Sequence, residues 1–433
     1  MRILRRFAGR AGYALALRVA WALISFAGAA LLARWFSTKD YGNYAAVISL
    51  VSFLAVVCAL GTPNALIRLL AEYGEGKQAG LARGVLNAAR GGALAASLGA
   101  ALILALGAVG LHWAGIVPEP AIYVAAALIL PAFTLIDVQG AAARTYGRIF
   151  TALGPRDVLW RLLLIPLAWV VASRVAPGDQ LVVFLLAAAA SLTALALVQA
   201  WSLRRATPPD LLAAAADYRL RDWAKISAAT WVTQMASAVF RTIDVVIAGI
   251  FLPPREVGLY FAASRVAALI SFVLTSTNMI LGPEVARLHH AGAHAELTRT
   301  LKLASLMIFL PSLLAFVVCV LFAEQVLGLF GAGFSEARPQ LLILAVGQLA
   351  NSAAGCVGLV LMMTGLERKN AEVLVTTSLA TVAAMAVLTP LYGTLGTAVA
   401  ASGGLIVWNL RLWLVARRHT AYDPSVLGLF RLA

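Results

Sequence analysis

The sequence predicts an all-α polytopic membrane protein, with about twelve transmembrane helices in two six-helix bundles related by a parallel internal repeat. Three observations lead to this fold class: the composition, the regular spacing of long apolar segments, and one short stretch that occurs twice. Apolar residues make up 62% of the 433 residues and charged residues 12%, against roughly 45–50% and 25% in soluble proteins. The mean hydropathy is +0.89. No soluble fold could bury this much apolar surface.

The repeated stretch occupies residues 39–46 (KDYGNYAA) and 255–262 (REVGLYFA), which lie 216 residues apart. Both copies have the pattern basic–acidic–x–Gly–x–Tyr–x–Ala, and each lies between two apolar segments. The charged pair and the glycine predict a short polar turn. The tyrosine then begins the next apolar run, where an interfacial tyrosine is expected in a membrane protein. An offset of half the chain length indicates two related halves.

The apolar segments give the helices in order, since a span needs roughly 20 apolar residues. The twelve candidate spans are 13–34, 44–62, 86–110, 120–142, 153–173, 181–201, 225–250, 259–281, 303–323, 340–363, 372–390 and 394–415. The longest polar interruption, 202–224, falls between the sixth and seventh spans. We therefore expect an N-terminal six-helix bundle over 1–201, a cytoplasmic linker over 202–224 and a C-terminal six-helix bundle over 225–433.

The basic residues predict the orientation, because cytoplasmic loops of membrane proteins are enriched in lysine and arginine. If the N-terminus is inside, the outer loops hold few basic residues: Arg34, Lys39, Arg174, Arg255 and Arg338. The cytoplasmic segments hold many more: Arg2, Arg5, Arg6, Arg10, Lys77, Arg83, Arg144, Arg148, Arg156, Arg204, Arg205, Arg219, Arg221, Arg287, Arg299, Lys302, Arg368, Lys369, Arg417 and Arg418. We expect both termini in the cytoplasm and both repeat turns on the outer face. Halves with an even number of spans then form a parallel repeat.

Enzymatic and cofactor chemistry finds no support in the sequence. The net charge of +15 is scattered over short loops rather than gathered on one face, which favours membrane topology over nucleic-acid binding. Three of the five histidines lie at 289–294, where a solvated polar loop is the better interpretation, and the three cysteines lie in apolar runs without CxxC spacing. No GxGxxG or Walker-type loop is present. We predict no catalytic residues, no cofactor and no metal site.

Charges inside the spans are the informative residues, because an ionised side chain in hydrocarbon costs at least about 2.5–3.5 kcal/mol and usually faces a cavity. These residues are Arg18 in the first span, Arg161 in the fifth, Arg241 and Asp244 in the seventh and Arg265 in the eighth. Arg18 lies close enough to the inner end to extend to the interface instead. A further acid, Asp137, lies near the inner end of the fourth span and is expected to pair with Arg144 or Arg148.

The seventh and eighth spans bring three of these charges together. Asp244 lies about nine residues before the second repeat turn and Arg265 about eight residues after it, so both are expected roughly 12–14 Å below the outer surface. Arg241 lies one helical turn deeper, on the face of Asp244. Asp244 and Arg265 could be a purely structural pair. Otherwise the excess of arginine predicts a cavity for an anionic group such as a diphosphate.

Four segments together resemble the Wzx-type oligosaccharide flippases of the multidrug/oligosaccharidyl-lipid/polysaccharide (MOP) exporter superfamily. The first combines Phe36-x-x-Lys39-Asp40-x-Gly42-x-Tyr44-x-Ala46 with 60–68 (LGTPNALIR). The second runs from Asp244 through Arg255-Glu256-x-Gly258-x-Tyr260-x-Ala262 to Val266. The third is 329–344, which contains LFGAGF, and the fourth is 390–400 (PLYGTLGTAVA). The resemblance covers nearly the whole chain, and the four segments occur in the family's order.

The resemblance implies two bundles that form a V around a central cavity and that translocate a polyprenyl-diphosphate-linked oligosaccharide across the cytoplasmic membrane by alternating access. The product would enter O-antigen (lipopolysaccharide) or exopolysaccharide synthesis, with H⁺ or Na⁺ as a candidate coupling ion and a polysaccharide polymerase as a candidate partner. On this interpretation Arg18, Arg161, Arg241 and Arg265 contact the diphosphate, an assignment that rests on their depth and charge. Asp244 would serve ion coupling or structure.

Three other functions stay open. A cation-coupled drug antiporter of the same superfamily would favour an acid-rich cavity. A peptidoglycan-precursor flippase would resemble a fourteen-helix plan, whereas we count twelve spans. A membrane glycosyltransferase or ligase would need a large outer domain, whereas the longest outer segment here is about 324–338.

Overall fold

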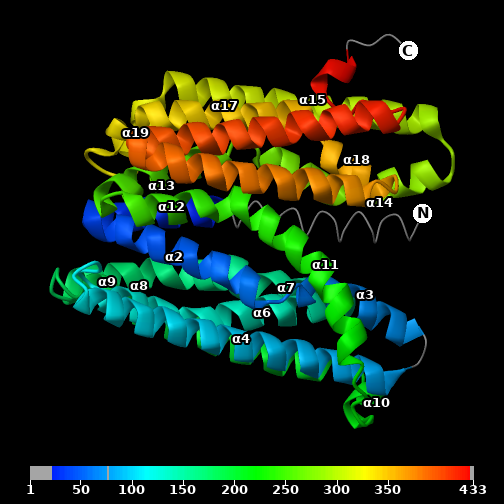
Figure 1. Cartoon of the computed structure of the whole chain (residues 1–433), viewed down its shortest axis with the longest axis horizontal. Helices are drawn as coiled ribbons and strands as arrows, with labels where there is room; N and C mark the ends of the chain where they lie inside the picture. Colours follow the sequence, from blue (N-terminus) through cyan, green and yellow to red (C-terminus); the bar gives the residue numbers. More distant parts are fainter. Residues whose placement is uncertain (1–21, 76–77, 430–433) are drawn as a thin grey trace. The chain divides into compact units, whose positions relative to one another are not determined.

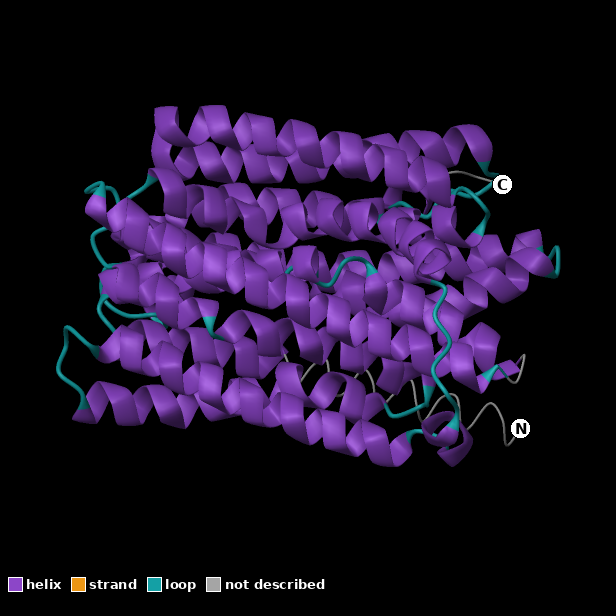
Figure 2. Cartoon of the chain, turned by 60° about the horizontal axis from the view of Figure 1, so that its bottom comes forward, coloured by secondary structure: helices purple, strands orange, loops and turns teal. Residues whose placement is uncertain are grey.

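In the computed structural model, which describes residues 22–75 and 78–429, every regular element of the described chain is a helix (Figure 2). The chain forms two compact units: one contains residues 35–238, and the other combines the segment before residue 35 with residues 239–433. Each unit is a bundle of long helices that lie side by side. In Figure 1 these are α4, α6 and α9 in the first unit and α15, α17 and α19 in the second.

The unit of residues 35–238 begins with α2 and ends with α11. Its helices are α2 (Thr38–Cys58), α3 (Thr62–Glu75), α4 (Ala79–Trp113), α5 (Pro120–Ala127), α6 (Ile129–Thr145), α7 (Ile149–Gly154), the π-helix η1 (Pro155–Trp160), α8 (Arg161–Arg174), α9 (Gln180–Ala206), α10 (Pro209–Ala213) and α11 (Leu220–Ala238). Helix α2 is capped by Ser37, whose hydroxyl accepts from the Asp40 amide and donates to Asp40 Oδ2 at 2.7 Å.

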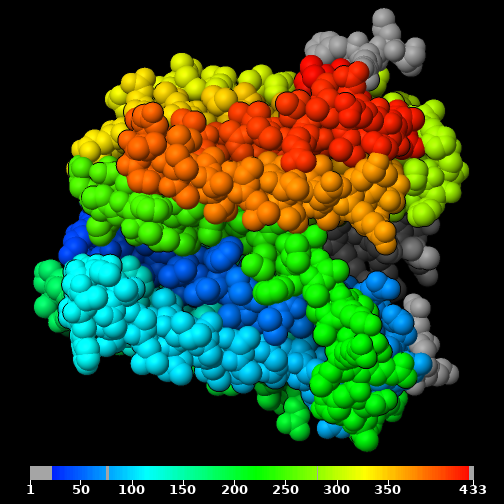
Figure 3. Space-filling model, viewed as in Figure 1, coloured from blue at the N-terminus to red at the C-terminus, as the bar shows by residue number. Residues whose placement is uncertain are grey.

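The other unit opens with the short apolar helix Ala22–Trp35. Its remaining helices are the π-helix η2 (Val239–Ile243), α12 (Asp244–Phe251), α13 (Pro254–Ala268), α14 (Phe272–His290), α15 (His294–Leu321), α16 (Ala323–Gly328), the 3₁₀-helix η3 (Phe334–Ala337), α17 (Arg338–Ala354), α18 (Val357–Met363), α19 (Glu367–His419) and the 3₁₀-helix η4 (Val426–Leu429). The orange-to-red surface in Figure 3 belongs mainly to α19.

Eight helices of the described residues are long and apolar enough to cross a membrane, or nine if α13 and the first part of α14, bent by 51°, form one span. The 53-residue α19 holds two of the expected spans, because Gly393 interrupts it with non-helical torsion angles. Two further expected spans coincide with the helix before residue 35 and with the charged series α7, η1 and α8. The all-helical prediction of about twelve spans is confirmed, and the protein is a multi-pass membrane protein.

Glycines mark the points where spans break. Leu60 and Gly61 have positive φ angles of 53° and 70°, between α2 and α3. A Cβ on Gly61 would lie 2.1 Å from the Ser227 carbonyl oxygen, so only glycine admits α11 here. Trp231 of α11 donates to the Val57 carbonyl, and Thr230 to that of Gly61.

The linker explains why α11 belongs to the unit of residues 35–238. Arg83 of α4 donates to the carbonyls of Leu212 and Ala214, both at 2.6 Å. The Asp217 amide donates to the Gly80 carbonyl. These bonds fasten the linker to the first turn of α4. The compact units thus divide the chain at residues 34/35 and 238/239, while the equal halves 1–201 and 225–433, with the linker 202–224, remain a prediction about the repeat.

The basic residues of both repeat turns form equivalent ion pairs. Lys39 binds Glu119 within one unit, and Arg255 binds Glu336 within the other, through Nη2 at 2.8 and 2.9 Å from its two carboxylate oxygens. The two basic residues lie 216 residues apart and the two glutamates 217. Glu119 and Glu336 were not part of the repeated motif, so their matching positions are independent support for an internal repeat.

The prediction of an interfacial tyrosine is wrong for the second copy. Tyr260 is fully buried within its unit, and its hydroxyl donates a hydrogen bond to Asp244. In the first copy Tyr44 is partly buried and packs on Phe184, with ring centroids 5.8 Å apart. Both tyrosines therefore hold helices together.

Candidate functional site

The structure distributes the predicted site residues over both units. Arg18 lies outside the described residues. Arg161 begins α8 and is partly buried. Arg241 lies in η2 with an exposed side chain, whereas Asp244, the first residue of α12, and Arg265 of α13 are partly buried. The structure thus brings Asp244, Arg265 and Arg241 into one unit and places Arg161 in the other.

Asp244 is held by Tyr260, the tyrosine of the second repeat turn. The Tyr260 hydroxyl donates to Asp244 Oδ2 at 2.8 Å. The Asp244 Oδ1 atom and the Arg265 Nε atom are buried without a hydrogen-bond partner among the described residues. The Arg265 guanidinium lies over the Phe261 ring, with 4.3 Å from Cζ to the ring centroid. Its charge is near enough to attract the Asp244 carboxylate.

This arrangement differs from the expected pair in one respect. Asp244 takes its hydrogen bond from Tyr260 rather than from Arg265, and a cation over an aromatic face keeps its N–H edges available. Asp244 Oδ1 and Arg265 Nε both lack a hydrogen-bond partner among the described residues, and buried polar groups normally have partners. The site can therefore accept a small polar or charged group at Asp244 and Arg265.

Arg241 owes its position to the π-helix. Residues 239–243 form η2 between α11 and α12, and π-helical turns occur often at functional sites. The neighbouring Phe240 stacks on Trp408 of α19, with centroids 5.1 Å apart and planes 16° from parallel. This stack anchors the turn while the Arg241 side chain is exposed.

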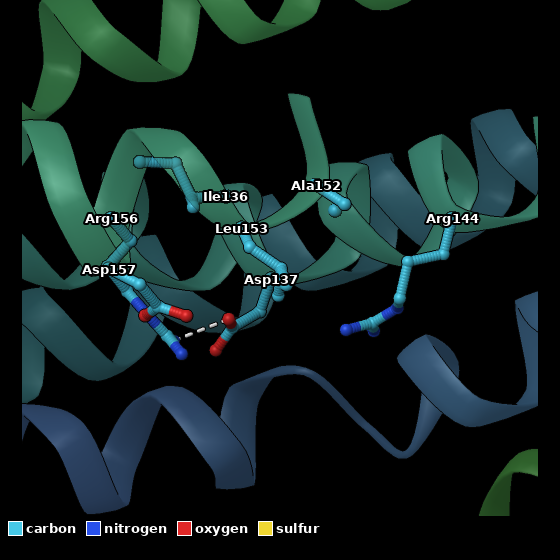
Figure 4. Close-up of a pocket in the computed structure, with 8 residues that line it drawn as sticks. Ile136, Asp137, Arg144, Ala152, Leu153, Arg156 and Asp157 are labelled. Atoms are coloured by element: carbon cyan, nitrogen blue, oxygen red, sulfur yellow. Dashed lines mark hydrogen bonds and ion pairs between the residues drawn. The ribbon is translucent and has the colours of Figure 1, made fainter. Parts of the chain in front are cut away.

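A second charged cluster, in the unit of residues 35–238, was not recognised as a site from the sequence (Figure 4). Arg156 of η1 forms ion pairs with Asp137 of α6 and with Asp157, whose Oδ1 lies 3.2 Å from Arg156 Nε. The pairing of Asp137 with Arg144 or Arg148 was therefore predicted wrongly. Figure 4 shows Arg144 apart from the bonded trio, on a cavity of about 30 Å³ that all four charged residues line.

The physical reason for the unexpected partner is again a π-helix. Because η1 starts at Pro155, its wider turn directs the two residues that follow toward α6. Arg156 also lies over the Phe133 ring, 5.0 Å from the centroid. The adjacent charges at 156 and 157 in an apolar segment were the signal in the sequence, but sequence periodicity does not reveal a π-helical turn. The trio can brace α6 against η1, and Arg144 adds a cation beside it.

The histidine-rich loop has a different role from the one expected of a solvated segment. Nδ1 of His294 and, at 3.4 Å, Nδ1 of His289 lie next to the Tyr422 hydroxyl. Partial burial raises the pKa of Tyr422. Within the described chain no group of three or more metal-binding side chains occurs. The histidines connect the chain after α19 to α14 and α15.

Comparison with known proteins identifies the family. The model of a family described as "Polysaccharide biosynthesis protein" matches residues 10–289, well over half of the chain. The chain belongs to this family. No curated protein matches it.

Solved structures of MOP-superfamily transporters resemble this member of the polysaccharide biosynthesis family over most of its length. An inward-facing multidrug resistance MATE family transporter has a TM-score of 0.70 at 15% identity, over 93% of this chain and 97% of that one. The lipid II flippase MurJ, in an inward closed conformation, has a TM-score of 0.69 at 12% sequence identity, over 95% of this chain and 87% of that one. A MOP superfamily transporter from Pyrococcus furiosus has a TM-score of 0.62 at 16% sequence identity, over 98% of this chain and 96% of that one. The chain thus has the fold of these transporters and flippases.

Proposed function

We propose that the protein flips a polyprenyl-diphosphate-linked oligosaccharide across the cytoplasmic membrane by alternating access, for O-antigen or exopolysaccharide synthesis. The observation that carries the proposal is the combination of family and charge. The family is one of polysaccharide biosynthesis. Arg241 lies in a candidate membrane span, Arg265 lies in the first helix of the bent pair, and Arg161 begins α8. Guanidinium groups match phosphate oxygens in geometry and charge.

A buried atom of Arg265 and the exposure of Arg241 support an anionic cargo. Arg265 Nε is buried without a hydrogen-bond partner among the residues that the structure describes, and Arg241 is exposed on a π-helical turn. In our proposal these two residues contact the diphosphate, together with Arg161 and Arg18, while the polyprenyl chain stays in the bilayer. Both termini face the cytoplasm, as the distribution of basic residues predicts.

A drug or organic-cation antiporter is the second candidate, because Asp244 is an acid inside a candidate membrane span. Asp244 has an unfilled buried oxygen, which suits H⁺ or Na⁺ as a coupling ion in either candidate. For the glycan flippase, Asp244→Asn should change the dependence of transport on pH or on the Na⁺ gradient. Unchanged transport across both gradients would leave Asp244 with a structural role only.

Complementation of a strain that lacks the protein tests the cargo. We expect Arg265→Ala and Arg241→Ala to reduce export of surface glycan at normal protein levels. A lost charged hydrogen bond of about 1.5–3 kcal/mol weakens binding by about 10- to 150-fold. Arg174→Ala, at the exposed end of α8, is the matched control and should export normally. Normal export by both test variants would refute the anionic-cavity proposal.

A further inference from the structure

The last helix of each expected half has, near its C-terminal end, a tryptophan with an arginine stacked on it. In α9 the Arg205 guanidinium lies over Trp201, with 3.8 Å from Cζ to the ring centroid. In α19 Arg417 lies over Trp413 at 4.7 Å. Both arginines are exposed, and both lie in the last turn of their helix.

The two arrangements lie at the ends of the sixth and twelfth expected spans, with an offset four residues shorter than that of the repeat turns. From Trp201 to Trp413 is 212 residues, and from Arg205 to Arg417 is also 212. Helix α9 is the sixth expected span, and the end of α19 is the twelfth. The pairing of tryptophan with arginine four residues later is therefore a repeated feature of the two halves.

Each pair lies at the end of an exposed apolar track. On α9 the track consists of Leu197, Val198 and Trp201, which are 56–67% exposed. On α19 it consists of Val407, Leu410 and Leu414, which are 39–50% exposed. A second exposed arginine follows each track, Arg204 on α9 and Arg418 on α19.

This combination has the shape and charge of a lipid site. An apolar track suits an acyl chain, a tryptophan suits the membrane–water interface, and a guanidinium stacked by one face keeps its N–H edges for phosphate oxygens. A helix C-terminus by itself disfavours an anion, so the arginine side chains must supply the attraction. Paired arginines at both sites meet this requirement.

We propose that the ends of α9 and α19 are two binding sites for an anionic phospholipid, with the phosphodiester on Arg205 in one and on Arg417 in the other. The orientation proposed above places both in the inner leaflet, but the binding chemistry does not depend on it. The sites are separate from the residues proposed for cargo. Each would hold the last helix of its half to the surrounding lipid.

Native mass spectrometry of the full-length protein in detergent, titrated with phosphatidylglycerol or phosphatidylethanolamine, tests this proposal. We expect up to two retained phosphatidylglycerol molecules and weaker retention of phosphatidylethanolamine. Arg205→Ala and Arg417→Ala should each weaken one site about five-fold, the equivalent of about 1 kcal/mol per basic residue, and the double variant should weaken both. An unchanged melting temperature without added lipid would show that the variants are folded.

Arg174→Ala is the matched control. Arg174 is exposed in the last turn of α8 near the exposed Trp169, but five residues of helix turn it to another face. Its removal costs the same charge and should leave lipid retention unchanged. Equal retention of the two lipids, wild-type retention by the double variant, or an equal loss in Arg174→Ala would overturn the proposal. Preferential displacement of phosphatidylglycerol by added undecaprenyl diphosphate would also overturn it, and would assign the sites to cargo.

Discussion

Removal of Arg156 tests the charged cluster of α6 and η1. The variant Arg156→Met keeps the length of the apolar stem but leaves Asp137 and Asp157 facing each other without their shared cation. Loss of one partner from a buried ion pair costs about 3–5 kcal/mol. The three side chains are 26–29% exposed, so we expect the lower end, about 3 kcal/mol. At about 2–4 °C per kcal/mol, the melting temperature should fall by roughly 6–12 °C.

The assay is thermal unfolding of the purified protein in detergent, followed by tryptophan fluorescence. The matched control is Arg144→Met, which removes a cation from the same cavity but not from the bonded trio (Figure 4). It should lower the melting temperature by less than half as much. Adding Asp137→Asn to Arg156→Met should recover part of the loss, because one unpaired charge is removed. Equal effects of the two methionine variants, or strictly additive effects in the double variant, would refute the pairing.

Four other substitutions have definite expected outcomes in the same assay. Tyr260→Phe removes the hydroxyl that donates to Asp244 Oδ2 and should cost about 1–3 kcal/mol; an unchanged melting temperature would contradict this bond. Gly355→Ala should destabilise strongly, because the new Cβ would lie 2.1 Å from a carbonyl oxygen, whereas Gly365→Ala, with a positive φ but no neighbour within 4 Å, should cost only about 1–2 kcal/mol. Arg255→Ala should lower the free energy of unfolding by at most about 1 kcal/mol, since its ion pair is more than half exposed. A larger decrease would mean that this ion pair stabilises the fold more than its exposure suggests.

The sequence was sufficient to predict the helices, but not all the irregular turns within them or the directions in which their side chains point. Apolar length and basic loops predict the spans, because hydrocarbon requires every backbone group to be bonded within a helix. The sequence placed a boundary between residues 390 and 394, and the Gly393 φ of 61° divides α19 there, but the π-helical turns η1 and η2 inside two expected spans are visible only in the structure. The division between the compact units at 238/239 was also not predictable, since it depends on how the linker is fastened to α4.

The sequence predicted which residues form the candidate site better than it predicted the hydrogen-bond and ion-pair partners of those residues. Depth and charge pointed to Asp244 and Arg265, and the structure places them in one unit. The partner of Asp244 is Tyr260, which the repeat pattern had suggested was interfacial, because a tyrosine at the start of a span fits either role. Arg156 was assigned to a loop because a π-helical turn has no periodicity signature, and that turn is what directs it to Asp137.

The most direct test of the proposed transport is a lipid extract from cells depleted of this protein, analysed by mass spectrometry for polyprenyl-diphosphate saccharides. We predict accumulation of one complete oligosaccharide unit on the lipid, together with loss of the surface polymer, and restoration of both by the wild-type chain. Absence of any accumulation, accompanied by new sensitivity to cationic drugs, would contradict the flippase and favour the antiporter.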